Sequence, residues 1–359
     1  MSELLPMPTA LLDYESNDLK SCIAMMKGGS KTFFAASRLL PMRVRAAATA
    51  LYAYCRVADD MVDQGGDVHA NLAILRHRLD LIYAGTPADF VEDHALSLVV
   101  QQHNLPRLFL DALLEGFEWD ALGRRYQTIE DLHAYAARVA GTVGAMMCWI
   151  MGSQSVATLA RACELGVAMQ MTNIARDVGE DARNGRIYLP LDWMQGAGLD
   201  ALQWLDDPQA TEIVKSQIGR LLDEADALYQ RAEPGIAELP PDCRAAIFAA
   251  SSIYGEIGRQ LRREGLDSIS RRTVVSTRRK LVLLAGAWTQ VRWVYADPEQ
   301  PDPLEAIRFL VDGCQSEMVG CANRKYFPNR TVSHRVERVL ALLERLENEK
   351  LNPKPFKIP

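Results

Sequence analysis

Apolar side chains recur at every third or fourth position along nearly the whole chain, whereas runs in which apolar and polar residues alternate are almost absent. A spacing of three and four matches the turn of an α-helix, while alternation would indicate β-strands. Alanine, leucine and arginine, which favour helices, are abundant. The pattern therefore predicts an all-α protein with roughly ten helices.

Proline and glycine divide this helical pattern into segments. The expected breaks are Leu40-Pro41, Gly65-Gly66, Gly85 to Pro87, Leu105-Pro106, Asn184-Gly185, Pro234-Gly235, Pro240-Pro241 and Pro298 to Pro303. In the carboxy-terminal part they leave helices near 207–232, 242–264, 273–294, 303–314 and 332–349. The last of these has one apolar face, which favours packing or docking over membrane insertion. The proline-rich tail 351–359 is expected to be mobile.

Composition and charge limit the kind of protein. The 359 residues are 48% hydrophobic with a formal net charge of −6, enough for a substantial core. The mildly acidic balance argues against a whole-protein role on nucleic acid. No uninterrupted apolar run reaches the roughly 18 residues of a membrane span, and no secretory signal is visible. Seven scattered cysteines without a CxxC favour a reducing compartment, so we expect a cytoplasmic protein.

Two aspartate pairs share one spacing: Asp59 and Asp63 in YCRVADDMVD, and Asp177 and Asp181 in NIARDVGED. Residues four apart lie on one face of a helix, so each pair can present two carboxylates to a hard cation such as Mg²⁺ or Mn²⁺. Asn173 lies four residues before Asp177 and extends the second row. An isolated pair of this kind is more often a solvated acidic face.

The surroundings of both pairs favour a binding site. Apolar residues flank them, and like charges in partly buried helices repel unless something positive offsets them. Arg56 precedes Asp59 by three residues, and Arg176 directly precedes Asp177. Salt bridges alone would explain these arginines. Acids that hold Mg²⁺ beside arginines that meet phosphate oxygens are also what a metal-bound diphosphate needs, and we prefer this interpretation.

Longer segments carry a family resemblance. LGVAMQMTNIARDVGEDARNGRIYLP (165–190) and YAARVAGTVGAMMCWI (135–150) resemble the two signature segments of the squalene/phytoene synthase family, and YAYCRVADDMVD resembles its first aspartate-rich motif. GSKTF (29–33) resembles the family's amino-terminal HSKSF-type segment, with Gly29 in place of histidine. The resemblance extends from about Ser30 to Pro190 and, more loosely, to Lys280.

The resemblance implies a fold and a division of the chain. The expected fold is a single-domain class I isoprenoid synthase-like helical bundle with a central active-site cavity. An amino-terminal segment (1–28) would precede a prenyl-diphosphate synthase helical domain (29–295), and a carboxy-terminal helical extension with a mobile tail (296–359) would follow it.

The resemblance also implies roles for individual residues. Asp59, Asp63, Asp177 and Asp181 would hold Mg²⁺ bridged to substrate diphosphates, with Asn173 assisting. Phosphate oxygens would be contacted by Arg56, Arg176, Ser30 and Thr32, whereas the reaction site would be lined by Tyr52, Gln170, Tyr135 and Tyr188. Apolar walls for prenyl tails would come from Phe33, Phe34, Met146, Met147, Met169 and Met171, although core packing is the commoner fate of such residues. The glycines Gly141 and Gly144 would permit close approach of a helix or of a substrate chain.

A basic run lies between residues 259 and 280, where eight cations accompany two acids. A solvated face is the default interpretation. By resemblance, Arg272 or Lys280 would close over the diphosphate, with Tyr254 beneath. Contact with anionic lipid is another interpretation, because the substrate and product dissolve there. The sequence leaves these alternatives open, including a peripheral membrane contact.

The activity implied by the resemblance is head-to-head condensation of two geranylgeranyl diphosphates, through a cyclopropyl diphosphate, to phytoene in carotenoid biosynthesis. The alternative is a C30 synthase of the dehydrosqualene or squalene type that uses farnesyl diphosphate. A more remote alternative is a non-catalytic assembly factor of the same fold, which would be expected to lack the acids. No dinucleotide fingerprint is visible and phytoene formation needs no reductant, so no NADPH is expected. The six histidines show no zinc spacing.

Overall fold

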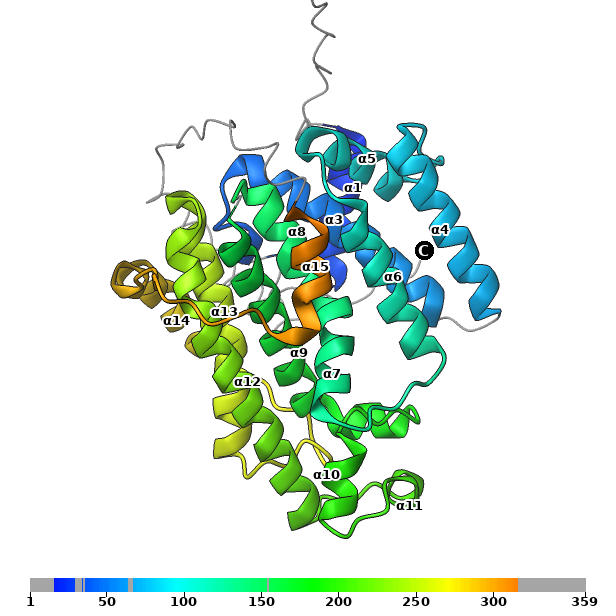
Figure 1. Cartoon of the computed structure of the whole chain (residues 1–359), viewed down its shortest axis with the longest axis vertical. Helices are drawn as coiled ribbons and strands as arrows, with labels where there is room; N and C mark the ends of the chain where they lie inside the picture. Colours follow the sequence, from blue (N-terminus) through cyan, green and yellow to red (C-terminus); the bar gives the residue numbers. More distant parts are fainter. Residues whose placement is uncertain (1–15, 30–33, 35, 64–66, 154, 316–359) are drawn as a thin grey trace, which may run out of the picture.

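Helices account for every regular element in residues 16–29, 34, 36–63, 67–153 and 155–315, the part of the chain that the computed structural model describes (Figure 1). This confirms the all-α prediction. The expected helix near 332–349 and the proline-rich tail lie outside the described residues. So do Ser30, Thr32 and Phe33 of the expected site.

The described helices are joined mostly by short connections, with longer ones before α14 and after η2. The amino-terminal half contains α1 (Asn17–Gly29), α3 (Met42–Asp63), α4 (Val68–Ala84), α5 (Val91–His103), α6 (Arg107–Ala121), α7 (Ile129–Ala136), the π-helical turn η1 (Ala137–Gly141) and α8 (Thr142–Met151). The remainder contains α9 (Val156–Arg183), α10 (Leu191–Gly196), α11 (Ala201–Asp206), α12 (Glu212–Glu238), α13 (Pro241–Arg263), α14 (Thr277–Gln290), the 3₁₀ turns η2 (Val291–Trp293) and η3 (Glu305–Ile307), and α15 (Arg308–Gly313). The described residues thus contain more helices than the roughly ten that the sequence predicts.

Local turn chemistry explains most of the boundaries. Helix α4 ends at Gly85, whose φ of 77° is the left-handed conformation that glycine adopts without strain. Helix α7 begins at a capping box in which Thr128 and Asp131 satisfy each other's backbone donors. The expected breaks at Pro41, Pro106, Gly185 and Pro240-Pro241 are confirmed in the same way.

The predicted break at Pro234-Gly235 is wrong, because α12 continues through it to Glu238. Proline removes a backbone donor and disturbs the preceding turn, yet Gly235 and Ile236 are buried. A Cβ on Gly235 would lie 2.4 Å from the Cβ of Arg161, so glycine permits close contact between α12 and α9. The packing of this turn outweighs the local cost of the proline.

Three carboxy-terminal helices also differ from their expected bounds. Thr211 caps α12, so the helix starts at Glu212 rather than near 207. Ser276 caps α14, which leaves the preceding segment from about 265 as a loop. The expected helix 303–314 is a 3₁₀ turn followed by α15. Hydroxyl caps therefore set starts that apolar periodicity could not locate.

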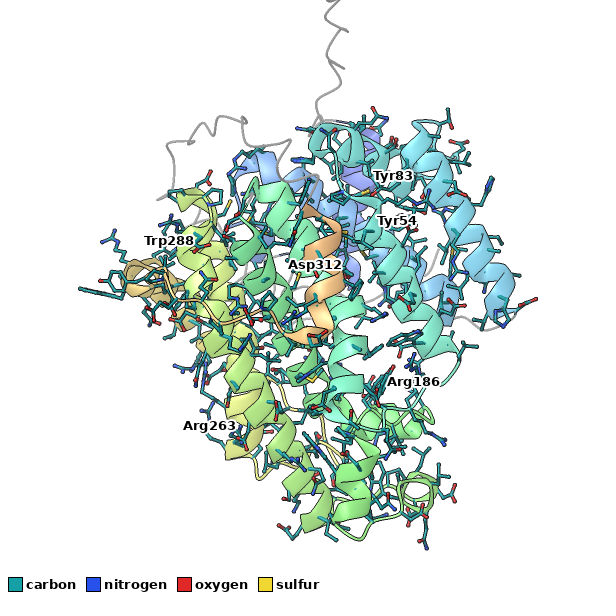
Figure 2. All side chains as sticks on the ribbon, in the orientation of Figure 1. Tyr54, Tyr83, Arg186, Arg263, Trp288 and Asp312 are labelled. Carbon is teal, nitrogen blue, oxygen red and sulfur yellow. The ribbon has the colours of Figure 1, made fainter. Side chains whose placement is uncertain are left out.

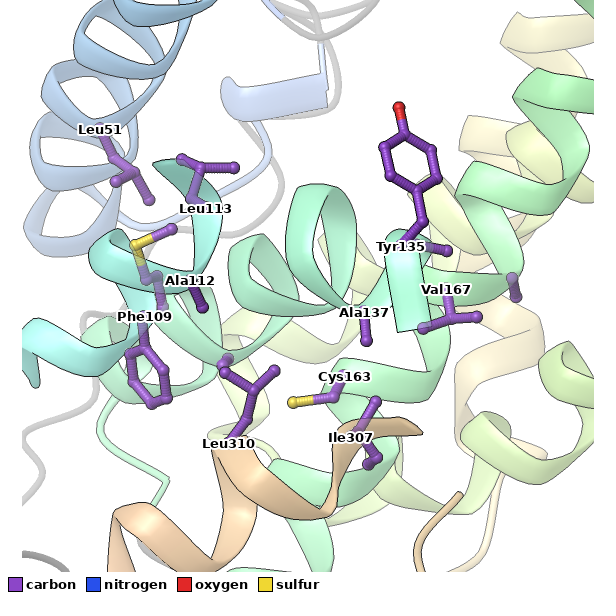
Figure 3. Packing of buried hydrophobic residues seen from close by; sticks show 14 of the residues in the cluster. Leu51, Phe109, Ala112, Leu113, Tyr135, Ala137, Cys163, Val167, Ile307 and Leu310 are labelled. Carbon is purple, nitrogen blue, oxygen red and sulfur yellow. The ribbon is translucent and has the colours of Figure 1, made fainter. Parts of the chain in front are cut away.

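Helix α9 forms the axis of the core, where it packs against α8, α12 and α13. Figure 3 shows Cys163 and Val167 of α9 beside Ala137, with Ile307 and Leu310 of the carboxy-terminal segment closing the same cluster. The described part of the carboxy-terminal extension thus shares the core of the preceding helices. The proposed boundaries at 28/29 and 295/296 stay predictions.

A buried ion cluster ties the carboxy-terminal segment to α9. Arg161 and Arg231 each donate from Nη2 to Oε1 of Glu164 at 2.9 Å. The backbone amide of Leu304 donates to the same oxygen at 3.0 Å, and Arg161 also donates to the carbonyl of Pro301 at 3.2 Å. Glu164 is completely buried, so its charge depends on these donors, and loss of both arginines would leave a buried charge without a counter-ion.

Residues Ile129–Met151 form one continuous helix through α7, η1 and α8. Its length and composition would by themselves allow it to cross a membrane. However, 61% of its most apolar window is buried inside the protein, and its neighbours are α6 and α9. The segment therefore packs as a helix of the core.

Close approach of α9 to η1 and α8 explains Gly144, one of the two expected glycines, and also Gly166. A Cβ on Gly144 would lie 2.1 Å from the carbonyl oxygen of Ala162, and a Cβ on Gly166 would lie 2.2 Å from that of Ala140. Gly141 has more room, with its nearest contact at 3.5 Å. The first two positions therefore tolerate only glycine without movement of one backbone against the other.

We predict that Gly144→Ala destabilises the fold by about 2 kcal/mol or more, because α8 must move away from α9. Gly28→Ala is the matched control, since a Cβ at Gly28 would meet nothing within 4 Å. Urea unfolding followed by circular dichroism measures both. Equal stability of Gly144→Ala and the wild type would contradict the prediction.

Candidate active site

The two aspartate pairs face a common space at the ends of α3 and α9. Arg186, in the loop after α9, donates from Nη2 to Oδ1 of Asp63 at 2.7 Å, and its backbone amide donates to the carbonyl oxygen of Asp181 at 2.9 Å. Arg186 therefore connects the first pair to the second. Figure 2 shows its side chain on the face of the molecule that carries α6 and α10.

Two arginines bind Asp177 of the second pair. Arg176 and Arg272 each donate from Nε to Oδ1 of Asp177 at 2.8 Å. Arg272 also lies 3.6 Å from the carboxylate of Glu180. Of the two basic residues expected to close over the site, the structure thus brings Arg272 to the acids, whereas Lys280 lies eight residues further on, in α14.

Gly179 explains how Arg272 reaches the second pair. The amide of Gly179 donates to the carbonyl of Ser268 at 3.1 Å, and a Cβ on Gly179 would lie 2.5 Å from the carbonyl oxygen of Ile269. The glycine between the two aspartates of DVGED therefore lets the loop before α14 lie directly on α9. This contact holds Arg272 beside Asp177.

The first pair has a looser arginine partner. Arg56 lies 2.5 Å from the carboxylate of Asp60 and 3.6 Å from that of Asp59. Tyr52, one turn earlier on α3, is half-buried, and its hydroxyl lies against Gly29. The structure thus places Tyr52 and Arg56 on the helix that carries Asp59, as expected.

The acids differ in how well their charge is offset. Burial, with repulsion from Asp63, raises the pKa of Asp59 to about 6. Burial, with repulsion from Asp177, raises the pKa of Asp181 to about 7. Burial opposes the charge on Asp177 too, but hydrogen bonds from Arg176 and Arg272 outweigh it and lower its pKa. Each pair therefore retains one carboxylate without sufficient positive compensation.

The donor set fits a hard divalent cation. Carboxylate oxygens are the ligands that Mg²⁺ and Mn²⁺ prefer, and the raised pKa values of Asp59 and Asp181 indicate negative charge in need of a cation. Among the described residues, no group of three or more His, Cys, Asp or Glu side chains gathers closely enough to hold an ion alone. A bound anion would have to supply further ligands.

Asp120 is a site residue that the sequence analysis missed. Tyr135 and Tyr188 donate their hydroxyl protons to its two carboxylate oxygens, at 2.6 and 2.7 Å. The two rings stack with a centroid distance of 5.2 Å, and Tyr126 packs against Tyr135 at 5.1 Å with its ring tilted by 34°. Burial raises the pKa of Asp120. Asp120 has no second aspartate four residues away that would mark a metal-binding pair. Only its apolar neighbours in the sequence could have indicated that it belongs to the site.

An apolar cavity of about 250 Å³ lies within the helix bundle, and its lining reaches Asn173, one turn before Asp177 on α9. Its wall comes from η1, α8, α9, α12 and α13, and polar side chains of Gln170, Asn173 and Tyr254 lie where α9 approaches the acids. Along α9 the lining runs from Asn173 to Thr158, about 22 Å at a rise of about 1.5 Å per residue. The arrangement can hold a long apolar chain with its charged end at the aspartates.

Only part of the expected apolar wall lines this cavity. Met147 and Met169 do so, whereas Phe34, Met146 and Met171 are buried in the core. Small residues of η1, α8 and α9 instead form much of the surface, including Ala140, Gly144, Ala162 and Gly166. Methionine periodicity did not distinguish the wall from the core, because both lie on the inner faces of the same helices.

Most arginines of the basic run 259–280 form ion pairs with acids of the same chain. Burial disfavours the charge on Glu256, but hydrogen bonds from Arg279, Arg259 and Arg263 lower its pKa to about 2. Arg262 pairs with two acids of α12 at 2.8 and 3.1 Å. The acids that balance this run therefore come mostly from outside it, which local charge counting could not show.

Comparison with known proteins identifies relatives of this arrangement. A family model described as squalene/phytoene synthase matches residues 26–280. A phytoene synthase of Rhodobacter capsulatus is 50% identical over 321 residues, which cover 88% of this chain and 93% of the relative. A 15-cis-phytoene synthase of a Paracoccus species is 39% identical, over 74% of this chain and 89% of the relative.

Solved structures show the same fold. A dehydrosqualene synthase in complex with ligand has 32% sequence identity and a TM-score of 0.71, over 77% of this chain and 97% of its own. A squalene synthase from Alicyclobacillus acidocaldarius has 26% identity and a TM-score of 0.65, over 69% and 94% respectively. The expected isoprenoid synthase-type helical bundle is confirmed.

We predict that Asp181→Asn raises the melting temperature of the metal-free protein by a few degrees at pH 8 and by less at pH 5. The pKa of Asp181 is raised to about 7 in the folded state. Between about pH 4 and pH 7 the folded state therefore holds a proton that the unfolded state has lost, so stability falls as the pH rises through this window.

Differential scanning calorimetry at both pH values, with and without Mg²⁺, measures this effect. Mg²⁺ should raise the melting temperature of the wild type at pH 8 more than that of the variant. Asp206→Asn, at an exposed acid of α11, is the control. A variant that melts below the wild type at pH 8 without metal would count against the charge repulsion.

Proposed function

The chain belongs to the squalene/phytoene synthase family, and from this premise we propose how it works. Relatives about half identical over most of the chain are phytoene synthases, so its activity is that of a phytoene synthase, a prenyl-transferring enzyme of carotenoid biosynthesis. We propose that its substrate is geranylgeranyl diphosphate. Two molecules would be joined head to head through a cyclopropyl diphosphate.

The observation that carries this proposal is an apolar cavity whose polar end, at Asn173, lies one turn from Asp177 on α9, with Arg186 joining the second acid pair to the first. Asp59, Asp63, Asp177 and Asp181, assisted by Asn173, would hold Mg²⁺ or Mn²⁺. The bound ions would neutralise the diphosphate leaving group, which favours ionisation of the allylic C–O bond. No NADPH is required in this proposal, because phytoene forms by loss of a proton.

The arginines would take up the charge that develops on the leaving diphosphate. Arg176 and Arg272 now hydrogen-bond to Asp177, and Arg56 pairs mainly with Asp60. A bound cation would compete for these carboxylates and free the guanidinium groups for phosphate oxygens, which they meet with planar, paired donors. The same groups would thus stabilise the free site and the bound diphosphate in turn.

The stacked tyrosines would face the carbocation. Aromatic faces attract cations, and an apolar cavity excludes the water that would quench one. Because Tyr135 and Tyr188 both donate to Asp120, their rings are held in one orientation beside the acids. Asp120 is therefore a positioning residue, which acts through the two phenols. Figure 3 shows the Tyr135 ring directed away from the buried cluster around Cys163.

The extent of the cavity supports a long prenyl chain as the substrate. Its lining follows α9 for about 22 Å, and small residues such as Ser37, Ala140 and Ala162 leave space along the wall. A second candidate, condensation of farnesyl diphosphate to a C30 product, is favoured by the likeness to a dehydrosqualene synthase structure. Product analysis distinguishes the two.

We also propose that the protein works in the cytoplasm. Cys22, Cys148, Cys163, Cys243 and Cys314 are buried free thiols, and Cys55 is a partly buried one. Unpaired cysteines of this kind are typical of proteins from reducing compartments. Fractionation of cells by compartment, followed by immunoblotting, tests this proposal.

We predict that the purified protein converts geranylgeranyl diphosphate to phytoene with Mg²⁺ or Mn²⁺ and without NADPH. Incubation with C15 and C20 diphosphates, followed by mass spectrometry of the extracted products, measures this. Squalene from the C15 substrate only with NADPH, or dehydrosqualene in preference to phytoene, would overturn the proposed substrate.

Asp59→Ala and Asp177→Ala are the companion variants for this measurement. Both should lose turnover by several orders of magnitude, because each removes one carboxylate of a pair. Full turnover in either variant would contradict the metal assignment. An inactive but folded wild type that still supports pigment formation in cells would favour the assembly-factor alternative.

We predict that Asp120→Asn lowers kcat about 100-fold with little change in KM, because misoriented tyrosines affect the reaction more than binding. Asp242→Asn is the matched control, since Asp242 is also buried and pairs with Arg43 at 3.0 Å, outside the site. Steady-state kinetics measure both variants. An equal loss of kcat in Asp242→Asn would show that Asp120 supports the fold and would contradict its role in positioning the tyrosines.

A further inference from the structure

An exposed apolar surface surrounds helix α14. Four of the exposed large apolar side chains in the described residues lie between 274 and 295: Val274 (67% exposed), Val282 (60%), Trp293 (75%) and Tyr295 (68%). Within α14, only Leu284 and Ala287 are buried. Figure 1 shows α14 projecting at one side of the bundle, and Figure 2 places Trp288 on that side. We call residues 274–295 the α14 surface.

The outward face of α14 combines a cation with apolar and small residues. Arg278, Val282, Ala285 and Thr289 follow one another at spacings of four, three and four, and all are exposed. Residues at these spacings share one face of a helix. Trp293 follows at the end of the 3₁₀ turn that extends the helix. An aromatic side chain thus ends a face that begins with a cation.

The α14 surface is positively charged. Residues 268–296 contain six cations and no acid. Three of the cations, Arg271, Arg272 and Arg279, pair with acids of other segments. Arg278 and Arg292 are exposed beside the apolar side chains. Exposed cations next to tryptophan and tyrosine are typical of helices that lie in the headgroup layer of an anionic membrane.

The charge argues against a second copy of the chain as the occupant. A symmetric dimer would place the same surface on both sides of the interface, so Arg278 and Arg292 would approach like charges with no acid between them. Anionic lipid headgroups instead supply the opposite charge at every point. The 14 residues of α14, about 21 Å long, suit a helix that lies along a bilayer rather than across it.

We propose that the α14 surface docks on an anionic lipid bilayer. Val282, Trp293 and Tyr295 enter the headgroup layer, and Arg278 and Arg292 meet lipid phosphates. Helix α14 packs on α13, and α13 contributes Ile247, Ala250 and Tyr254 to the cavity wall. Docking would therefore leave only α13 and α14 between the cavity and the lipid bilayer, in which a C40 hydrocarbon product dissolves. The proposal rests on this surface and not on the length of the substrate.

Co-sedimentation of the full chain with vesicles tests the proposal. Vesicles of phosphatidylcholine with phosphatidylglycerol should bind the wild type, and high salt or phosphatidylcholine alone should weaken binding. The double variant Trp293→Ser/Tyr295→Ser should bind about tenfold more weakly to both kinds of vesicle. Arg278→Gln and Arg292→Gln should each weaken binding about fivefold, and only to anionic vesicles.

Matched controls lie on other surfaces. Leu122→Ser/Leu202→Ser removes side chains that are 57% and 53% exposed, and Arg125→Gln removes an exposed cation; neither change should affect vesicle binding. Turnover in detergent micelles should be normal in all variants, which excludes misfolding as the cause of weaker binding.

Three results would overturn the proposal. The first is a wild type that does not bind anionic vesicles. The second is undiminished binding by the α14 variants, which would locate the contact elsewhere in the chain. The third is a dimer in vesicle-free solution that the α14 substitutions dissociate, because the surface would then be an interface between copies.

Discussion

Burial of carboxylates, together with the repulsion between them, is the constraint on which the functional region depends. Arg186 offsets Asp63, and Arg176 and Arg272 offset Asp177, but Asp59 and Asp181 keep pKa values of about 6 and 7 because no cation compensates them fully. The folded protein thus retains an electrostatic cost at neutral pH that a divalent ion can relieve. Affinity for metal and sensitivity to pH have the same physical origin.

Helix α9 connects this charged region to the apolar one. Its carboxy-terminal end carries Asp177 and Asp181, whereas the part from Thr158 to Asn173 both lines the cavity and holds the buried cluster around Glu164. Gly144 and Gly166 bring α8 and η1 into backbone contact with α9. Because one packed helix spans all three regions, the distance from the acids to the end of the cavity is fixed by the core. Substrate length is therefore coupled to the packing that stabilises the fold.

Several features of the site could be predicted because they are local. A separation of four residues identified both aspartate pairs, and the neighbouring arginines indicated a bound anion such as a diphosphate. Other features required contacts between distant segments. The choice between Arg272 and Lys280 depended on a loop that Gly179 admits onto α9, and Asp120 acquired its role from tyrosines 15 and 68 residues away. The proline in α12 misled the prediction, because buried contacts with α9 outweighed its local preference.

The sequence by itself determined the helical class, most helix ends, the two aspartate pairs and the family resemblance, since periodicity, turn residues and short motifs act over a few neighbouring positions. The tertiary structure decided which side chains meet: Arg186 with Asp63, Arg272 with Asp177, and two tyrosines with Asp120. It also separated the cavity wall from the core and left the α14 surface exposed. These outcomes depend on how helices pack, and packing is set by contacts between residues far apart in the chain.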